Sequence, residues 1–159
     1  MIRRTAAAIV MIAAFCPSAW GFAMAVADFK PNGVPFHLGS AVSEVIRIEM
    51  ASIPGVDLTV VDVNHVKKAA SEQRIGMSGL VDPASAAKVG KVVGARYVLV
   101  GSVNSLGGEV SLESRLIDVE TGTILDSLSV VSYDGQEGLI EAARFLAGDL
   151  KMILVSDDG

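Results

Sequence analysis

The chain has 159 residues, of which 51% are hydrophobic, and a formal net charge of −5 at pH 7. This length is enough for one domain with a core of its own. The excess of acidic residues excludes a nucleic-acid binder, because phosphate contacts need clustered Lys and Arg.

The first 21 residues have the pattern of a secretory signal. Arg3 and Arg4 precede the uncharged stretch 5–15, and the small residues Ala19 and Gly21 stand at −3 and −1 of a cut site. Eleven apolar residues are too few for a membrane span, which needs about 20. We therefore expect a signal peptide that is cleaved after Gly21.

Cleavage there divides the chain into a signal peptide, residues 1–21, and an exported domain, residues 22–159. A second small-x-small triplet offers a cut after Ala25 as an alternative. Lipid attachment at Cys16 would need a small residue before the cysteine, and Phe15 is bulky. We therefore expect Cys16 to be discarded with the signal, without a lipid anchor.

The composition of the exported domain follows from this cut. Loss of Arg3 and Arg4 leaves 11 basic and 18 acidic residues, a net charge near −7. Without a cysteine the domain can form neither a disulfide nor a thiolate metal site. It contains no stretch of 18 apolar residues, so we expect a periplasmic protein with no membrane-spanning segment, bound neither to nucleic acid nor to anionic lipid.

Strands and helices alternate in the first part of the domain. The apolar run 23–29 predicts a buried strand, which the turn residues 30–33 close. Apolar residues at helical spacing predict an amphipathic helix over 38–50, and residues 56–61 predict a second strand.

Two more helices follow. Residues 64–74 predict a polar helix with a thin apolar stripe, and residues 76–79 a loop. Asp82 can cap the next helix and Pro83 fits its first turn, because proline has no amide to satisfy there. Gly94 can take the left-handed conformation that ends this helix.

The second part predicts three strands and a last helix. Residues 97–103 form an apolar strand, and residues 110–116 and 124–132 form a hairpin around the turn 120–122. The last helix covers about 136–154. The order predicts an α/β fold: a mixed sheet of about five strands, parallel in its first half and an antiparallel meander in its second half, with helices packed on it.

Chemically reactive side chains are few. His37 lies just before one predicted helix and His65 in the first turn of another, and neither has a partner at metal-ligand spacing. We interpret both as exposed or capping residues. Ser102 and Asp118 could join a histidine in a triad only by assembling in space, which spacing does not show. We expect no catalytic, cofactor-binding or metal-binding residues, and no enzyme.

Three stretches that contain glycine allow other interpretations. Residues 76–79 lack the Lys and Ser or Thr of a phosphate loop. Gly90 and Gly94 have the spacing of paired membrane helices, but their helix bears lysine, so we expect close packing on the sheet. Gly101 in an apolar strand predicts a bulge or a close backbone contact.

The predicted hairpin carries four carboxylates, Glu109, Glu113, Asp118 and Glu120. We interpret them as solvent-facing charge that keeps a sheet edge from pairing with copies of itself. A binding face is the alternative interpretation.

Three stretches resemble a known family: 24–29 (MAVADF), 72–103 (from EQRIGMSGLVDP to VGARYVLVGSV) and 115–125 (RLIDVETGTIL). They resemble the CsgG family, the curli-secretion component and its relatives, which include LpoB-type activators of penicillin-binding proteins and the flagellar FlgO and FlgT envelope proteins. The resemblance implies a periplasmic α/β domain like CsgG and the N-terminal domain of TolB. It also implies work by docking on envelope proteins or by packing with copies of itself, without catalysis.

Channel-forming members of that family carry long membrane hairpins at two places. The corresponding stretches here, 104–108 and 133–135, have only five and three residues. A membrane strand needs about 9–11 residues, so this chain has the periplasmic body without the pore.

These observations lead to three hypotheses. The first is a non-enzymatic adaptor or structural subunit in envelope assembly or curli-type secretion, which contacts envelope proteins and itself as a homo-oligomer. The alternative is an LpoB-like regulator that binds and activates a penicillin-binding protein; the long tether of such proteins is missing, which favours the first hypothesis. The third is a small-ligand enzyme, which would need a pocket with convergent polar groups.

Overall fold

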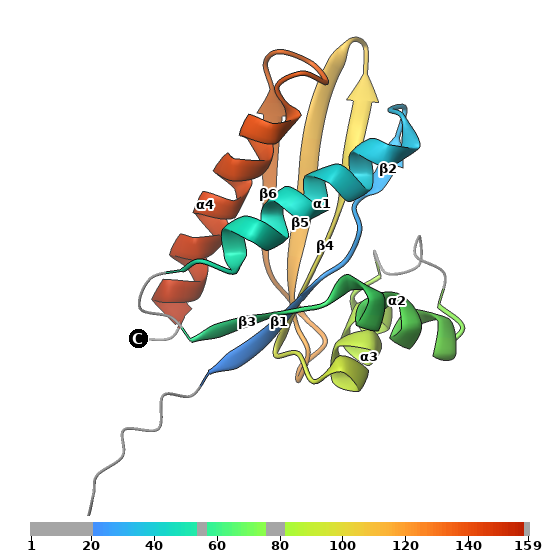
Figure 1. Cartoon of the computed structure of the whole chain (residues 1–159), viewed down its shortest axis with the longest axis vertical. Helices are drawn as coiled ribbons and strands as arrows, with labels where there is room; N and C mark the ends of the chain where they lie inside the picture. The colour runs from blue at the N-terminus through green and yellow to red at the C-terminus, as the bar shows by residue number, and fades with distance from the viewer. Residues whose placement is uncertain (1–20, 54–56, 76–81, 158–159) are drawn as a thin grey trace, which may run out of the picture.

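The computed structural model describes residues 21–53, 57–75 and 82–157. Within them a six-stranded mixed sheet has helices on both faces (Figure 1). The strands are β1 (Phe22–Val26), β2 (Lys30–Asn32), β3 (Leu58–Val61), β4 (Tyr97–Leu106), β5 (Glu109–Asp118) and β6 (Ile124–Ser132). The helices are α1 (Phe36–Met50), α2 (Val63–Glu72), α3 (Pro83–Val93) and α4 (Leu139–Asp157). No helix in these ranges is long and apolar enough to cross a membrane.

The strand order β3-β1-β4-β5-β6 confirms the predicted fold class. Strands β1, β3 and β4 are parallel, and β4, β5 and β6 form the antiparallel meander. The prediction missed one strand: β2, which was interpreted as a turn, pairs in parallel with β4 beyond the end of β1. Pro31 is tolerated there because β2 lies at the edge of the sheet, where a missing amide breaks no ladder.

Helices α1 and α4 cover one face of the sheet along its length (Figure 1). Between them and the sheet lies the larger apolar core, to which the sheet contributes buried residues such as Leu99 and Leu112. The helical residues of this core include those of the predicted stripes (Val42, Ile46 and Met50 in α1; Ala143, Leu146 and Leu150 in α4). The predicted amphipathic helices are therefore confirmed on this face.

Helices α2 and α3 cover only part of the opposite face. They pack Val66 and Val89 against Val98 and Ile117 in a second, smaller core. A Cβ added at Gly90 would collide with valine side chains of the sheet, which confirms the predicted close packing.

The ends of α3 also agree with the sequence. The Asp82 carboxylate accepts a hydrogen bond from the Ser85 backbone amide at 3.0 Å, Pro83 is the first helical residue, and Gly94 has φ +70°. The loop predicted over 76–79 lies outside the described residues, as does the predicted signal segment 1–20.

Side chains of α1 hold the break between β1 and β2. The buried Arg47 donates hydrogen bonds to the carbonyl of Val26 at 3.2 and 2.9 Å, and the Phe29 amide donates to the Ser43 hydroxyl at 2.8 Å. These bonds satisfy backbone groups that leave the ladder where the chain bends. Ser43 and Arg47 are polar residues of α1, and both are buried.

Asp28 connects the two helical layers. Its carboxylate lies 2.6 Å from the guanidinium of Arg47 in α1 and 2.8 Å from the ammonium of Lys67 in α2. Burial raises the pKa of Asp28, but hydrogen bonds and charges from Lys67 and Arg47 outweigh burial and hold this pKa below its ordinary value. The ionised form of Asp28 therefore stabilises the fold.

We expect Asp28→Asn to lower the free energy of unfolding by about 2 kcal/mol at neutral pH, because it leaves the buried Arg47 without its carboxylate. Because the folded pKa lies below the unfolded one, this contribution is complete above pH about 4 and is lost as the pH falls through the folded value. Urea unfolding at a series of pH values measures both effects.

Glu44→Gln is the matched control, since Glu44 contacts the same guanidinium but has a side chain 59% exposed. We expect a change below about 0.5 kcal/mol. Equal losses from the two variants would contradict a special role of Asp28.

Candidate interaction surface

The residues with potential chemistry do not assemble. His37 lies within the first turn of α1, not before the helix as predicted, and His65 lies in α2; both are exposed. Ser102 pairs with Glu113, whereas Asp118 pairs with Tyr97, about 16 Å away along β4.

The carboxylate of Asp118 has a local role instead. It accepts hydrogen bonds from the Thr121 backbone amide at 2.7 Å and the Thr121 hydroxyl at 2.9 Å, which close the predicted turn. Both hydrogen bonds lower the pKa of Asp118, and the bond from the Thr121 backbone amide has the larger effect. In the described ranges no three His, Cys, Asp or Glu residues lie together as metal ligands would.

One half of a sheet face carries no helix among the described residues. It lies beyond α2 and α3, which sit beside the lower part of the sheet in Figure 1. Cross-strand pairing places polar side chains there in rows, such as Ser102–Glu113–Ser129. We call this half the open face; it comprises Ser102, Asn104, Ser111, Glu113, Arg115, Ser127 and Ser129.

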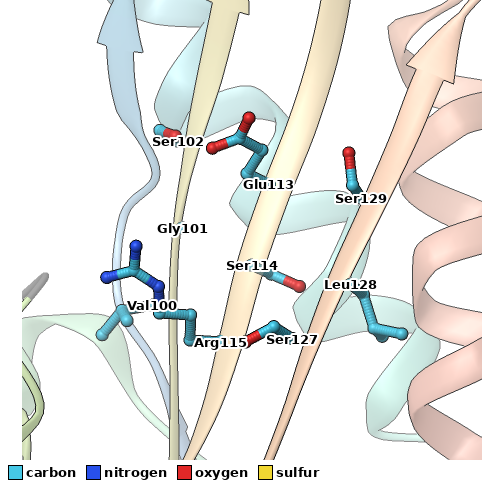
Figure 2. A pocket seen from close by; sticks show the side chains of 9 residues that line it. All are labelled: Val100, Gly101, Ser102, Glu113, Ser114, Arg115, Ser127, Leu128 and Ser129. Carbon is cyan, nitrogen blue, oxygen red and sulfur yellow. The ribbon is translucent and has the colours of Figure 1, made fainter. Parts of the chain in front are cut away.

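The open face is hollowed across β4, β5 and β6. A hollow of about 280 Å³ is lined by side chains including Val100, Glu113 and Arg115 (Figure 2). Ser114 and Leu128 also border it, but they alternate with the open-face residues and point toward the helical layer of α1 and α4 (Figure 2). The hollow is open to solvent and has a mixed polar and apolar lining, which suits contact with a protein surface better than enclosure of a small ligand.

The position of Glu113 corrects the interpretation of the carboxylates as edge protection. Strand β5 lies between β4 and β6, so Glu109 and Glu113 are not on an edge strand. The edge is β6. Glu113 stands on the open face instead, beside Ser102 and Ser129.

Apolar side chains border the open face at its far end. Leu106, the last residue of β4, is 86% exposed, and Tyr133, directly after β6, is 95% exposed. Val131, on the same face of β6, is also exposed. We call Leu106, Val131 and Tyr133 the apolar tip. With one strand between β4 and β6, its members lie about 10 Å apart, close enough for one partner to cover.

The apolar tip was not among the residues predicted from the sequence. The signal was present in Leu106, which precedes the pair Gly107-Gly108, and in Tyr133 between Ser132 and Asp134. Each of these large apolar residues lies at the end of a strand, next to a polar turn, and both are exposed.

The predicted close contact at Gly101 is confirmed, and the bulge is not present. A Cβ at this position would meet the Phe29 ring, and β4 pairs with β5 without a register shift. Gly101 therefore serves the packing of the α1 layer, behind the open face.

The chain matches the family described as peptidoglycan-synthase activator LpoB over residues 40–126, more than half of its length. It belongs to the LpoB family. The match begins in α1 and ends in β6, so it includes most of the sheet. The family is one of regulators rather than enzymes, in agreement with the expectation from the sequence. A search of curated proteins finds no match.

Solved structures show the same fold. The C-terminal domain of LpoB from Salmonella enterica has 22% identity and a TM-score of 0.56, over 70% of this chain and 82% of that one. The LpoB structure from E. coli has 22% identity and a TM-score of 0.59, over 70% of this chain and 56% of that one. PelC from Paraburkholderia phytofirmans, described as a dodecamer, has 19% identity and a TM-score of 0.50, over 81% of this chain and 85% of that one.

These comparisons narrow the resemblance. The expected group of envelope proteins is correct, but CsgG and curli secretion are not supported specifically; the matching family is LpoB, which the sequence analysis had named as a relative. The LpoB comparison therefore favours the hypothesis that had been the alternative.

We expect Ser114→Ala to leave stability unchanged or to raise it by about 1 kcal/mol. The Ser114 hydroxyl is buried and has no hydrogen-bond partner among the described residues, so its removal relieves a desolvation cost. Thermal unfolding measures the change. A loss above about 1 kcal/mol would show that Ser114 has a polar partner after all.

Proposed function

We propose that this chain binds a peptidoglycan synthase of the penicillin-binding-protein class in the periplasm and activates it. The observation that carries the proposal is the family match over residues 40–126, from α1 to β6. The LpoB structures from Salmonella enterica and E. coli support it through a shared fold. Activation here means a change in the synthase that is caused by contact with this chain.

We further propose that the open face and the apolar tip form the docking surface. The two together have the composition of a transient interface, with a few exposed apolar residues beside a polar area. Tyrosine is enriched among residues that dominate binding, and Tyr133 and Leu106 are free to enter a partner's pocket. The face under α1 and α4 is not available, because its apolar residues are already buried.

Export by a signal peptide and a periplasmic location are part of this proposal, since the synthase acts on the cell wall. Lipid attachment at Cys16 stays an open alternative to release. The predicted homo-oligomer also stays a prediction, which the molar mass of the purified protein in solution would test.

The direct test adds the purified mature chain to a membrane-embedded class A penicillin-binding protein from the same organism and follows the rate of glycan-strand synthesis and peptide cross-linking. We expect the chain to increase at least one of these rates. An unchanged rate, together with no detectable binding, would contradict the proposed function.

Variants then test the surface separately from the function. We expect Leu106→Ala and Tyr133→Ala each to weaken binding about tenfold or more, with an unchanged thermal midpoint because both side chains are exposed. Phe145→Ala and Met152→Ala are matched controls: both residues are exposed on α4, 63% and 64%, away from the open face, and should bind normally. Activation that survives at the tip variants but fails at the controls would move the docking surface to α4.

A further inference from the structure

The start of β1 fixes how much of the N-terminus the fold can lose. Phe22 is the first residue of the strand, it is 8% exposed, and its ring packs edge-on against Tyr97 with centroids 5.4 Å apart. Strand β1 lies between β3 and β4 and pairs with both. The fold therefore needs the chain from Phe22 onward.

This requirement separates the two cut sites that the sequence left open. A cut after Ala25 would remove four of the five residues of β1, including Met24 and Ala25, which are both 0% exposed. The parallel ladders to β3 and β4 would lose their central strand. A cut after Gly21 removes nothing from the sheet, since Gly21 is exposed and precedes β1.

Asp57 lies opposite Gly21 and carries a negative charge. The backbone carbonyl of Asp57 accepts a hydrogen bond from the Phe22 amide at 2.9 Å. The Asp57 carboxylate lies against Gly21, because a Cβ built on Gly21 would collide with its Oδ2 and lie 2.7 Å from its Cγ. A small residue is therefore required at position 21 for two reasons: the pattern of the signal cut site and the close approach of Asp57.

We propose that the chain is processed at the Gly21–Phe22 bond and that the new α-ammonium group of Phe22 pairs with Asp57. A signal peptidase adds water across this peptide bond: the Gly21 carbonyl carbon takes the hydroxyl and leaves as a carboxylate, and the Phe22 nitrogen becomes an ammonium. The nitrogen then keeps its hydrogen bond to the Asp57 carbonyl and has two further protons to donate. The carboxylate of Asp57 lies beside the space that Gly21 vacates.

The surroundings make a counter-charge at this place valuable. The Arg96 guanidinium lies 5.5 Å from the centroid of the Phe22 ring and 4.9 Å from that of Tyr97, so a second cation packs on the side chain of the residue that carries the new amine. Asp57 offsets this repulsion on the side of β3. On the other side, Phe22 and Arg96 line a hollow that Lys91 and the carboxylate-bearing Glu120 also border. Processing thereby converts a neutral strand end into an ion pair that fastens β1 to the chain before β3.

Expression of the full chain with its own signal, followed by N-terminal sequencing of the periplasmic protein, tests the cut. We expect the sequence FAMAV, starting at Phe22. A start at Val26, or a lipid-modified start at Cys16, would overturn the proposal.

Thermal unfolding of the Asp57→Asn variant, in two proteins with different N-termini, tests the ion pair. We expect Asp57→Asn to lower the midpoint of the protein that starts at Phe22 by about 1–3 °C, as an exposed ion pair would. The same substitution should cost less than half as much when an exchanged signal leaves Trp20 and Gly21 in place, because the ammonium is then two residues away. Equal shifts in both backgrounds would overturn the pairing, whatever the synthase assay shows.

Discussion

Arg47 is a charged group inside the protein, and the path of the first two strands depends on it. Strand β1 and strand β2 both run along β4, but the chain leaves the ladder between them at Ala27–Phe29. Arg47 donates hydrogen bonds to the carbonyl of Val26 and the carboxylate of Asp28, and the Ser43 hydroxyl accepts one from the amide of Phe29. A buried guanidinium is costly unless its donors are used, and here the strand break supplies the acceptors. Helix α1 and the break therefore require each other, and Lys67 extends the same contact to α2.

Helices cover the two faces of the sheet to different extents. One face is closed along its length by α1 and α4 over an apolar core. The other is closed only where α2 and α3 pack on residues such as Val98 and Val100. Farther along β4 and β5 the same face carries Ser102, Glu113 and Arg115, and the change from valine to polar residues marks where the helical cover stops. This division leaves a polar part of the sheet without a helix over it among the described residues, and that part is the surface that we propose for docking.

Much of this arrangement could be predicted from the sequence, because it rests on local rules. The stripe Val42, Ile46 and Met50, the cap at Asp82 and the alternation along β5 each follow from periodicity or from backbone chemistry. The misses involve distant partners. Pairing of β2 depends on β4, some seventy residues later, and burial of Arg47 depends on an acceptor in another strand. The interior position of β5 depends on β6, so carboxylates that looked like edge protection proved to lie on an internal strand. The family was predicted as CsgG, with LpoB only as a relative, whereas the family model that matches the chain is LpoB.

The central claim is that the open face and the apolar tip contact a peptidoglycan synthase. Amide NMR spectra of the isotope-labelled mature chain, recorded during titration with the periplasmic part of the synthase, test this claim residue by residue. We predict shifted or broadened signals for Ser102–Ser111 and for Ser127–Tyr133, with the outer face of α4 unchanged. Changes confined to α1 and α4, with the signals of β4, β5 and β6 unaltered, would contradict it.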